Sequence, residues 1–299
     1  MSTIYRVIEK GCFMINKLPG GGVKGNIFDL LPKEEDKIRL PGFMKRGLII
    51  NELELEGFKY HRIRSLKEHT VEKRAVLFLP GGGGMARAIR LHYDTVKRIA
   101  IATGAEVIMA HYPLAPKYNV RFALDWLEKL YSLMLEEYAP ENITFIGDSA
   151  GANLILSITN RVAIRPGRLI VISPACGLEN GKNRDIRKKM EPKDPLFTVA
   201  TNDTIAENWC RNVPLDSPDI SPEYISYDGF PPVMLFYGSH ELFYPHVRNM
   251  IRIMEKDGVR LCAEEQPMCH DWALCSFLPE GRMAIKKMSR VIIDNHFSV

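Results

Sequence analysis

The sequence predicts an α/β fold in which helices cover a mostly parallel, doubly wound sheet. Short apolar runs alternate along the chain with longer amphipathic segments, a spacing typical of strand–helix–strand units. The runs are rich in Val, Ile and Phe and end at Gly, Pro or Ser, as expected of strands buried on both faces. They are AVLFL (75–79), EVIMA (106–110), ITFIG (143–147), RLIVIS (168–173) and PVMLFYG (232–238).

The segments between these runs carry apolar residues at helical spacing. Helices are expected over 87–103, 119–138 and 244–257. A final strand is expected within 259–267, and a closing helix around 279–294.

Two regions depart from this alternation. Residues 1–45 contain a weak helical pattern followed by loops rich in Gly and Pro, and residues 177–230 form a long polar insertion between two strands. An insertion of that length usually has helices and a role of its own. We expect it to lie over the carboxyl edge of the sheet, where open α/β folds bind their ligands.

Composition narrows the class of protein. The chain has 299 residues and a formal net charge of +4 without a dense basic stripe, so nucleic acid is not an expected partner. No apolar run approaches the roughly 18–20 residues that span a membrane, and the start shows no signal peptide pattern. The six cysteines lack zinc-like spacing and are expected to be free thiols in a reducing cytoplasm. The oligomeric state is left open, with a homodimer as one option.

The strongest motif is GDSAG, residues 147–151, which has the form G-x-S-x-G. A predicted strand ends at Gly147, Ser149 follows, and a helical pattern begins at once with Ala150. A strand, a sharp turn and a helix in this order hold the hydroxyl out from the sheet edge, at a helix N-terminus. The motif therefore predicts Ser149 as a nucleophile.

A serine nucleophile needs a base, and the base needs an acid that orients it. In sites built on such a turn, the acid and then the histidine follow the serine along the chain. Among the late histidines, His246 lies within a predicted helix and His296 lies beyond the last one. His270 lies in a loop after a predicted strand, so it is the predicted base.

The acid is expected just after the strand 232–238. Glu241 is the only carboxylate in that loop and is therefore the predicted acid. Asp271 is adjacent to His270, but a neighbour in sequence rarely turns back to bond the imidazole that precedes it.

Two similar glycine runs, LPGGGG (79–84) and LPGGG (18–22), invite comparison. Acyl transfer needs backbone N–H groups aimed at the developing oxyanion, and Ala150, after the nucleophile, supplies one. The run at 79–84 follows a predicted strand and leads into a helix, so it is expected to supply the others. The run at 18–22 follows no strand and is interpreted as a linker or hinge. Neither run has the pattern of a phosphate loop.

Taken together, the motifs resemble the hormone-sensitive-lipase-like branch of the α/β-hydrolase superfamily, which includes carboxylesterases and acetyl esterases. The resemblance covers roughly residues 72–295 and includes LPGGGG, GDSAG, YPLAP (112–116), DISP (219–222), GSHEL (238–242) and CHDWAL (269–274). It implies a catalytic triad of Ser149, Glu241 and His270. It also implies Gly82, Gly83 and Ala150 as the oxyanion donors.

The resemblance further implies a helical cap on an α/β-hydrolase core. The expected division is an N-terminal cap segment (1–45), a core made of 46–176 and 231–299, and a cap insertion (177–230). This chain departs from the family twice. Pro80 replaces a histidine that helps to hold the oxyanion loop, and Lys117 replaces the glutamate after YPLAP.

The expected function is that of a serine carboxylesterase acting on short-chain acyl esters, with a small-molecule ester as partner and no metal or cofactor. One alternative is an amidase or deformylase with the same triad. Another is a non-catalytic ligand-binding protein on a hydrolase fold, which the absent histidine at position 80 favours and the intact triad disfavours. The alcohol moiety and the acyl length are not determined by the sequence.

Overall fold

The computed structural model describes residues 1–16, 31–33, 37–67, 73–178, 182–295 and 297. The glycine run at 18–22 and His296 lie outside these residues. The described residues contain an eight-stranded sheet in the order β1-β2-β4-β3-β5-β6-β7-β8. Its strands are β1 (Leu48–Leu55), β2 (Phe58–Ser65), β3 (Ala75–Leu79), β4 (Glu106–Ala110), β5 (Ile143–Asp148), β6 (Arg168–Ile172), β7 (Val233–Gly238) and β8 (Leu261–Gln266).

Six neighbouring strands pair in parallel, in the order β4, β3, β5, β6, β7 and β8. The strands β1 and β2 add an antiparallel edge next to β4. The mostly parallel α/β fold expected from the sequence is confirmed. The hairpin of β1 and β2 was not anticipated, because its half-exposed strands lack a continuous apolar run. Glu56 and Gly57 form its turn with φ of 48° and 84°, the left-handed backbone that tight hairpins favour.

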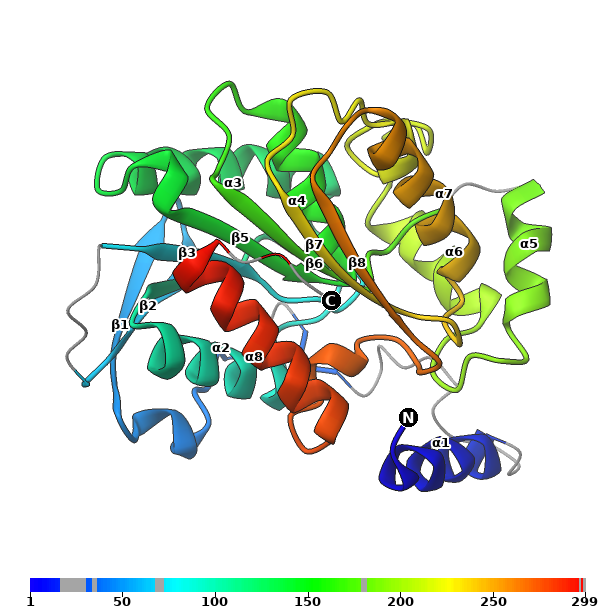
Figure 1. The fold of residues 1–299 in the computed structure, drawn as a ribbon. Helices are drawn as coiled ribbons and strands as arrows, with labels where there is room; N and C mark the ends of the chain where they lie inside the picture. The colour runs from blue at the N-terminus through cyan, green and yellow to red at the C-terminus, as the bar shows by residue number, and fades with distance from the viewer. Residues whose placement is uncertain (17–30, 34–36, 68–72, 179–181, 296, 298–299) are drawn as a thin grey trace.

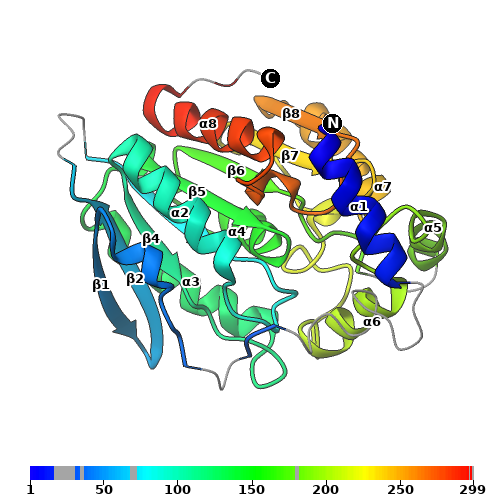
Figure 2. The ribbon, with the colours of Figure 1, turned by 90° about the horizontal axis from the view of Figure 1, so that it is seen from below.

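Helices cover both faces of the sheet (Figures 1 and 2). Successive β3 residues point to opposite faces, so Leu77 packs with the core under α3, α4 and α7, and Phe78 with the core under α2 and α8. The helices are α1 (Thr3–Asn16), α2 (Arg90–Thr103), α3 (Val120–Leu135), α4 (Ala150–Arg161), α5 (Lys182–Met190), α6 (Val199–Asn208), α7 (Tyr244–Lys256) and α8 (Pro279–Asp294), with short 3₁₀ turns at Gly42–Lys45, Pro140–Asn142, Pro222–Tyr224 and Trp272–Leu274.

Helices α1, α5 and α6 lie together at one end of the molecule, beside the carboxyl edge of the parallel strands (Figure 2). The insertion 177–230 contains α5 and α6, and α1 comes from the N-terminal segment. This is the place expected for a cap, although the division into core and cap stays a prediction.

Two further sequence expectations concern thiols and membranes. All six cysteines are free thiols. No helix among the described residues is both long enough and apolar enough to cross a bilayer.

Candidate active site

Ser149 occupies a strained turn between β5 and α4, with φ of 51° and ψ of −117°. Backbone in this region is costly for a residue with a side chain and persists only where the surroundings enforce it. Here the Ser149 N–H donates to the Ile172 carbonyl oxygen (2.9 Å), and the Ser149 carbonyl accepts from the Ala175 N–H (3.1 Å). Contacts with β6 and the loop after it therefore hold the serine in place.

The two glycines of the GDSAG motif are required by close backbone packing. A Cβ atom on Gly147 would lie 2.4 Å from the Gly151 carbonyl oxygen, and a Cβ on Gly151 would lie 2.0 Å from the Leu79 carbonyl oxygen. Because neither position has room for a side chain, α4 can start directly beneath the glycine-rich loop that follows β3.

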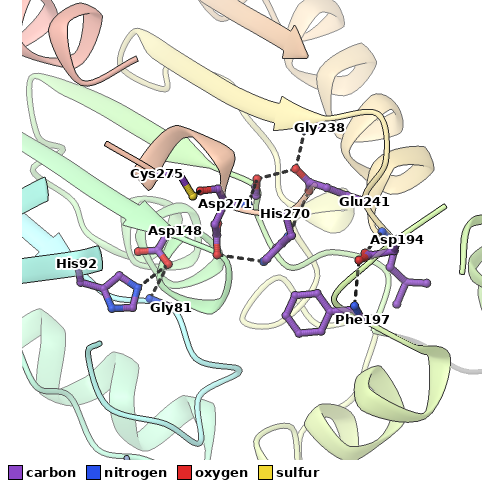
Figure 3. Close-up of polar contacts among 12 residues, drawn as sticks. Gly81, His92, Asp148, Asp194, Phe197, Gly238, Glu241, His270, Asp271 and Cys275 are labelled. Carbon is purple, nitrogen blue, oxygen red and sulfur yellow. Dashed lines mark hydrogen bonds and ion pairs between the residues drawn. The ribbon is translucent and has the colours of Figure 1, made fainter. Parts of the chain in front are cut away.

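The structure brings His270 and Glu241 together from the loops after β8 and β7 (Figure 3). His270 Nδ1 lies 3.3 Å from Glu241 Oε2. The other oxygen, Oε1, accepts hydrogen bonds from the Ser173 hydroxyl (2.6 Å) and the Gly238 N–H (2.5 Å). Both His270 and Glu241 are buried, and the Phe197 ring packs edge-on against the imidazole with centroids 4.8 Å apart. Glu241 is thus placed to orient the imidazole.

Asp271 contacts the opposite side of the same imidazole. Its Oδ2 lies 3.3 Å from His270 Nε2, and its N–H donates to the Ser173 hydroxyl (3.1 Å). The expectation that Asp271 would not turn back was wrong. The left-handed backbone at Asp271, with φ of 57°, turns its carboxylate toward Nε2, while Nδ1 faces Glu241.

These contacts set the charge of the imidazole. Burial lowers the pKa of His270, but the carboxylates of Asp271 and Glu241 outweigh it and raise that pKa to about 9. Burial also raises the pKa of Asp271 well above its ordinary value, against the lowering effect of His270. The two groups are best treated as one pair that shares its last proton.

The glycine run at 79–84 forms a loop of unusual backbone beside Ser149. Gly82, Gly83 and Gly84 have φ of 122°, 63° and 67°, and the Gly81 N–H donates to Asp148 Oδ2 (2.9 Å). Within the described residues, nothing accepts a hydrogen bond from the N–H of Gly82, Gly83 or Ala150. Since Ala150 begins α4, its N–H has no acceptor within the helix.

A cavity of about 290 Å³ connects these groups. Ser149, His270 and Gly81 to Gly83 line it, and α1 and α6 contribute Ile8 and Ile205. A larger groove of about 530 Å³ between α2 and α8 contains none of the predicted site residues. Among the described residues, no group of three or more His, Cys, Asp and Glu side chains is arranged to hold a metal ion.

Asp194, which the sequence analysis did not single out, joins the insertion to the loop that carries Glu241. Its fully buried carboxylate accepts hydrogen bonds from the N–H groups of Leu196 (2.7 Å), Phe197 (2.9 Å) and Leu242 (2.7 Å). Burial raises the pKa of Asp194, although these hydrogen bonds oppose the shift. In the sequence, the residues around Asp194 (Asp194-Pro195-Leu196) do not indicate this role.

Comparison with known proteins identifies the family of the chain. Residues 76–274 match the family model described as alpha/beta hydrolase fold. The chain belongs to the alpha/beta-hydrolase family. It is 30% identical to an acetyl-hydrolase of Streptomyces hygroscopicus over 71% of this chain and 73% of that protein. It is 32% identical to the carboxylesterase/phospholipase LipF of Mycobacterium tuberculosis over 74% of this chain and 62% of that protein.

A solved structure supports the same fold. An esterase from the bacterial hormone-sensitive lipase family superposes with a TM-score of 0.78 at 21% identity, covering 98% of both chains. With the sequence relatives, this confirms the resemblance to the hormone-sensitive-lipase-like branch that the motifs indicate.

Proposed function

We propose that this protein, a carboxylic ester hydrolase of the alpha/beta-hydrolase family, cleaves short-chain acyl esters through an acyl-enzyme on Ser149. One observation carries the proposal. Ser149, on its strained turn, opens into the same cavity as His270, whose Nδ1 faces the buried carboxylate of Glu241. The names acetyl-hydrolase and esterase given to its relatives support the ester as substrate class.

In this proposal His270 Nε2 accepts the proton of the Ser149 hydroxyl as the oxygen attacks the ester carbonyl. Glu241 holds the imidazole in the tautomer that this requires. The N–H groups of Gly82, Gly83 and Ala150 stabilise the oxyanion. His270 then protonates the leaving alcohol, and a water molecule, deprotonated by the same imidazole, releases the acid.

The size of the cavity supports a short acyl group. At about 290 Å³ it lies near the lower end of the range of small-molecule sites. Ile8, Phe197 and Ile205 line it from the N-terminal segment and the insertion, so both of these segments limit the length of the bound chain.

The test is a series of p-nitrophenyl esters from acetate to laurate, with Ser149→Ala as the control. We expect kcat/KM to be highest for acetate or butyrate and to fall toward laurate. Ser149→Ala should fold and should reduce turnover by about 10⁴-fold or more. A folded Ser149→Ala protein with wild-type turnover would remove the triad from consideration, and a maximum at laurate would contradict the short-chain assignment.

The same series separates the alternatives. Faster cleavage of p-nitroacetanilide than of p-nitrophenyl acetate would favour an amidase. A purified wild-type protein that cleaves neither compound but still binds esters would favour a ligand-binding protein. The cytoplasmic location stays an expectation from the sequence.

A further inference from the structure

The loop that carries Gly82 and Gly83 needs external support. Gly81 to Gly84 are four consecutive residues without side chains, and three of them have positive φ. Such a segment is conformationally free in isolation. Oxyanion donors are effective only when they are fixed before the charge develops. The groups that hold this loop therefore affect any acyl transfer at Ser149.

Besides the bonds that the Gly82 carbonyl accepts from the N–H groups of Met85 and Ala86, three hydrogen bonds among the described residues connect the loop to other parts of the chain. The Tyr112 hydroxyl donates to the Pro80 carbonyl oxygen (2.7 Å), and the Ala115 N–H donates to the Gly84 carbonyl oxygen (2.8 Å). The third is the bond from the Gly81 N–H to Asp148 Oδ2 (2.9 Å). A Cβ atom on Gly81 would lie 2.3 Å from that same oxygen, so the carboxylate packs directly against the loop backbone.

Asp148 connects the loop to the nucleophile. It is the last residue of β5 and immediately precedes Ser149, and it is fully buried. The oxygen that accepts from the Gly81 N–H also lies 3.0 Å from His92 Nε2 (Figure 3). The position of this carboxylate therefore depends on a histidine from another part of the chain.

The hydrogen bonds of His92 determine its tautomer. Its Nδ1 lies 2.9 Å from the Ile89 N–H, which can only donate. Nδ1 must therefore be the acceptor, so the proton of a neutral imidazole is on Nε2 and is donated to Asp148. His92 lies in the first turn of α2 and is 5% exposed. Nδ1 thus fixes the orientation of the ring, and Nε2 donates to the buried carboxylate.

We propose that His92 is a positioning residue of this active site, which acts through Asp148 to hold the oxyanion loop in register with Ser149. The inference rests on the proposed acyl transfer at Ser149. Its consequence is specific. Loss of the Nε2–H donor frees Asp148 and with it the Gly81 N–H, so the donors of the loop lose their alignment with the transition state. His92 also lines the cavity, but among the described residues its ring nitrogens bond only the Ile89 N–H and Asp148, so ground-state binding should change less than kcat.

Two amide substitutions separate the two nitrogens of His92. The amide nitrogen of His92→Gln overlaps Nε2 and can donate to Asp148. The side chain of His92→Asn overlaps Nδ1, so it can accept from the Ile89 N–H but cannot reach Asp148. We expect His92→Asn to lower kcat by roughly 10²-fold, the scale of one lost oxyanion donor, with KM within about threefold. His92→Gln should recover at least about tenfold of that loss.

A transition-state analogue gives a readout that a purely structural role would not change. The affinity for phenylboronic acid should fall in parallel with kcat in His92→Asn and recover in His92→Gln. His246→Asn is the matched control, since His246 is another buried histidine paired with a carboxylate, Glu223, and does not line the cavity. Its kcat should stay within about threefold of wild type.

The outcomes are distinguishable. Wild-type protein without Ser149-dependent turnover would refute the proposed function itself. Active wild-type protein with unchanged kcat in folded His92→Asn would overturn the positioning role. So would equal losses in the Asn and Gln variants. If His92→Asn does not fold, His92→Phe replaces it, because Phe keeps the ring volume and lacks both hydrogen bonds; an unchanged kcat there would overturn the role as well.

Discussion

Replacing Asp271 with asparagine is expected to increase ester turnover at neutral pH. In the proposed mechanism His270 Nε2 accepts the proton of Ser149, and in the structure this nitrogen lies 3.3 Å from Asp271 Oδ2. While the shared proton is on His270, the imidazole has no free lone pair, and the Asp271 carboxylate favours that state. The base becomes free when His270 loses this proton.

The size of the effect follows from the pKa of His270. Burial lowers this pKa, but Asp271 and then Glu241 raise it to about 9, so only about 1 in 100 molecules holds an unprotonated imidazole at about pH 7. Each unit by which this pKa falls raises the fraction of unprotonated imidazole at neutral pH roughly tenfold. Because Asp271 makes the largest raising contribution, Asp271→Asn should raise kcat/KM by about tenfold near neutral pH and by little above about pH 10.

The assay is the pH dependence of kcat/KM for p-nitrophenyl acetate in both proteins. Stability offers a second readout, because the folded-state pKa of His270 lies above its unfolded value of about 6.5. The protonated imidazole stabilises the fold below about pH 6.5, and this contribution disappears as pH rises through about 9. The wild-type Tm should therefore fall more than that of Asp271→Asn over this window. Superimposable pH profiles of kcat/KM for the two proteins would show that Asp271 does not control the protonation of His270. A decrease of kcat/KM in Asp271→Asn as large as the decrease in Glu241→Gln would identify Asp271 as the acid that orients His270.

Three further substitutions test other parts of the site. Glu241→Gln should lower kcat by orders of magnitude, because the buried partner of His270 Nδ1 loses its charge; a kcat within threefold of wild type would rule out Glu241 as the acid. Gly82→Val should lower kcat by roughly 10²-fold, since its Cβ would lie 2.7 Å from the Ala86 carbonyl oxygen at a φ of 122°, and full activity would remove this loop from the oxyanion site. Asp194→Ala should lower the Tm measured by circular dichroism, because the N–H groups of Leu196, Phe197 and Leu242 lose their buried acceptor, whereas an unchanged Tm would show that they find other partners.

The sequence anticipates what depends on local pattern. The parallel strands β3 to β7 are largely apolar runs, and the turn at Ser149 is a contiguous strand, turn and helix with glycines where the backbone leaves no room. Chain order then suffices to pick out His270 and Glu241, which the structure brings within 3.3 Å of each other. The catalytic roles of these residues stay predictions.

The remaining features depend on contacts between distant parts of the chain. His92 and Asp148 are 56 positions apart, and Asp194 and Leu242 are 48 apart, so no local pattern connects them. The sequence leaves open what holds a loop with Pro80 in place of the family histidine. In the structure, the Gly81 N–H donates to Asp148, which His92 contacts in turn, and the Tyr112 hydroxyl donates to the Pro80 carbonyl oxygen. These bonds help to hold the loop.

Asp271 shows a different limit. Its backbone conformation, with φ of 57°, reverses the direction of the side chain, and a single sequence gives little indication of a left-handed residue that is not glycine.

Covalent labelling shows whether Ser149 is an activated nucleophile. Purified protein is treated with a fluorophosphonate, which reacts preferentially with an activated serine, and the adduct is located by peptide mass spectrometry. We expect one adduct per chain on Ser149, its absence in Ser149→Ala, and faster labelling at alkaline than at neutral pH. An adduct on another residue, or no adduct in a folded protein that cleaves p-nitrophenyl acetate, would contradict this role of Ser149.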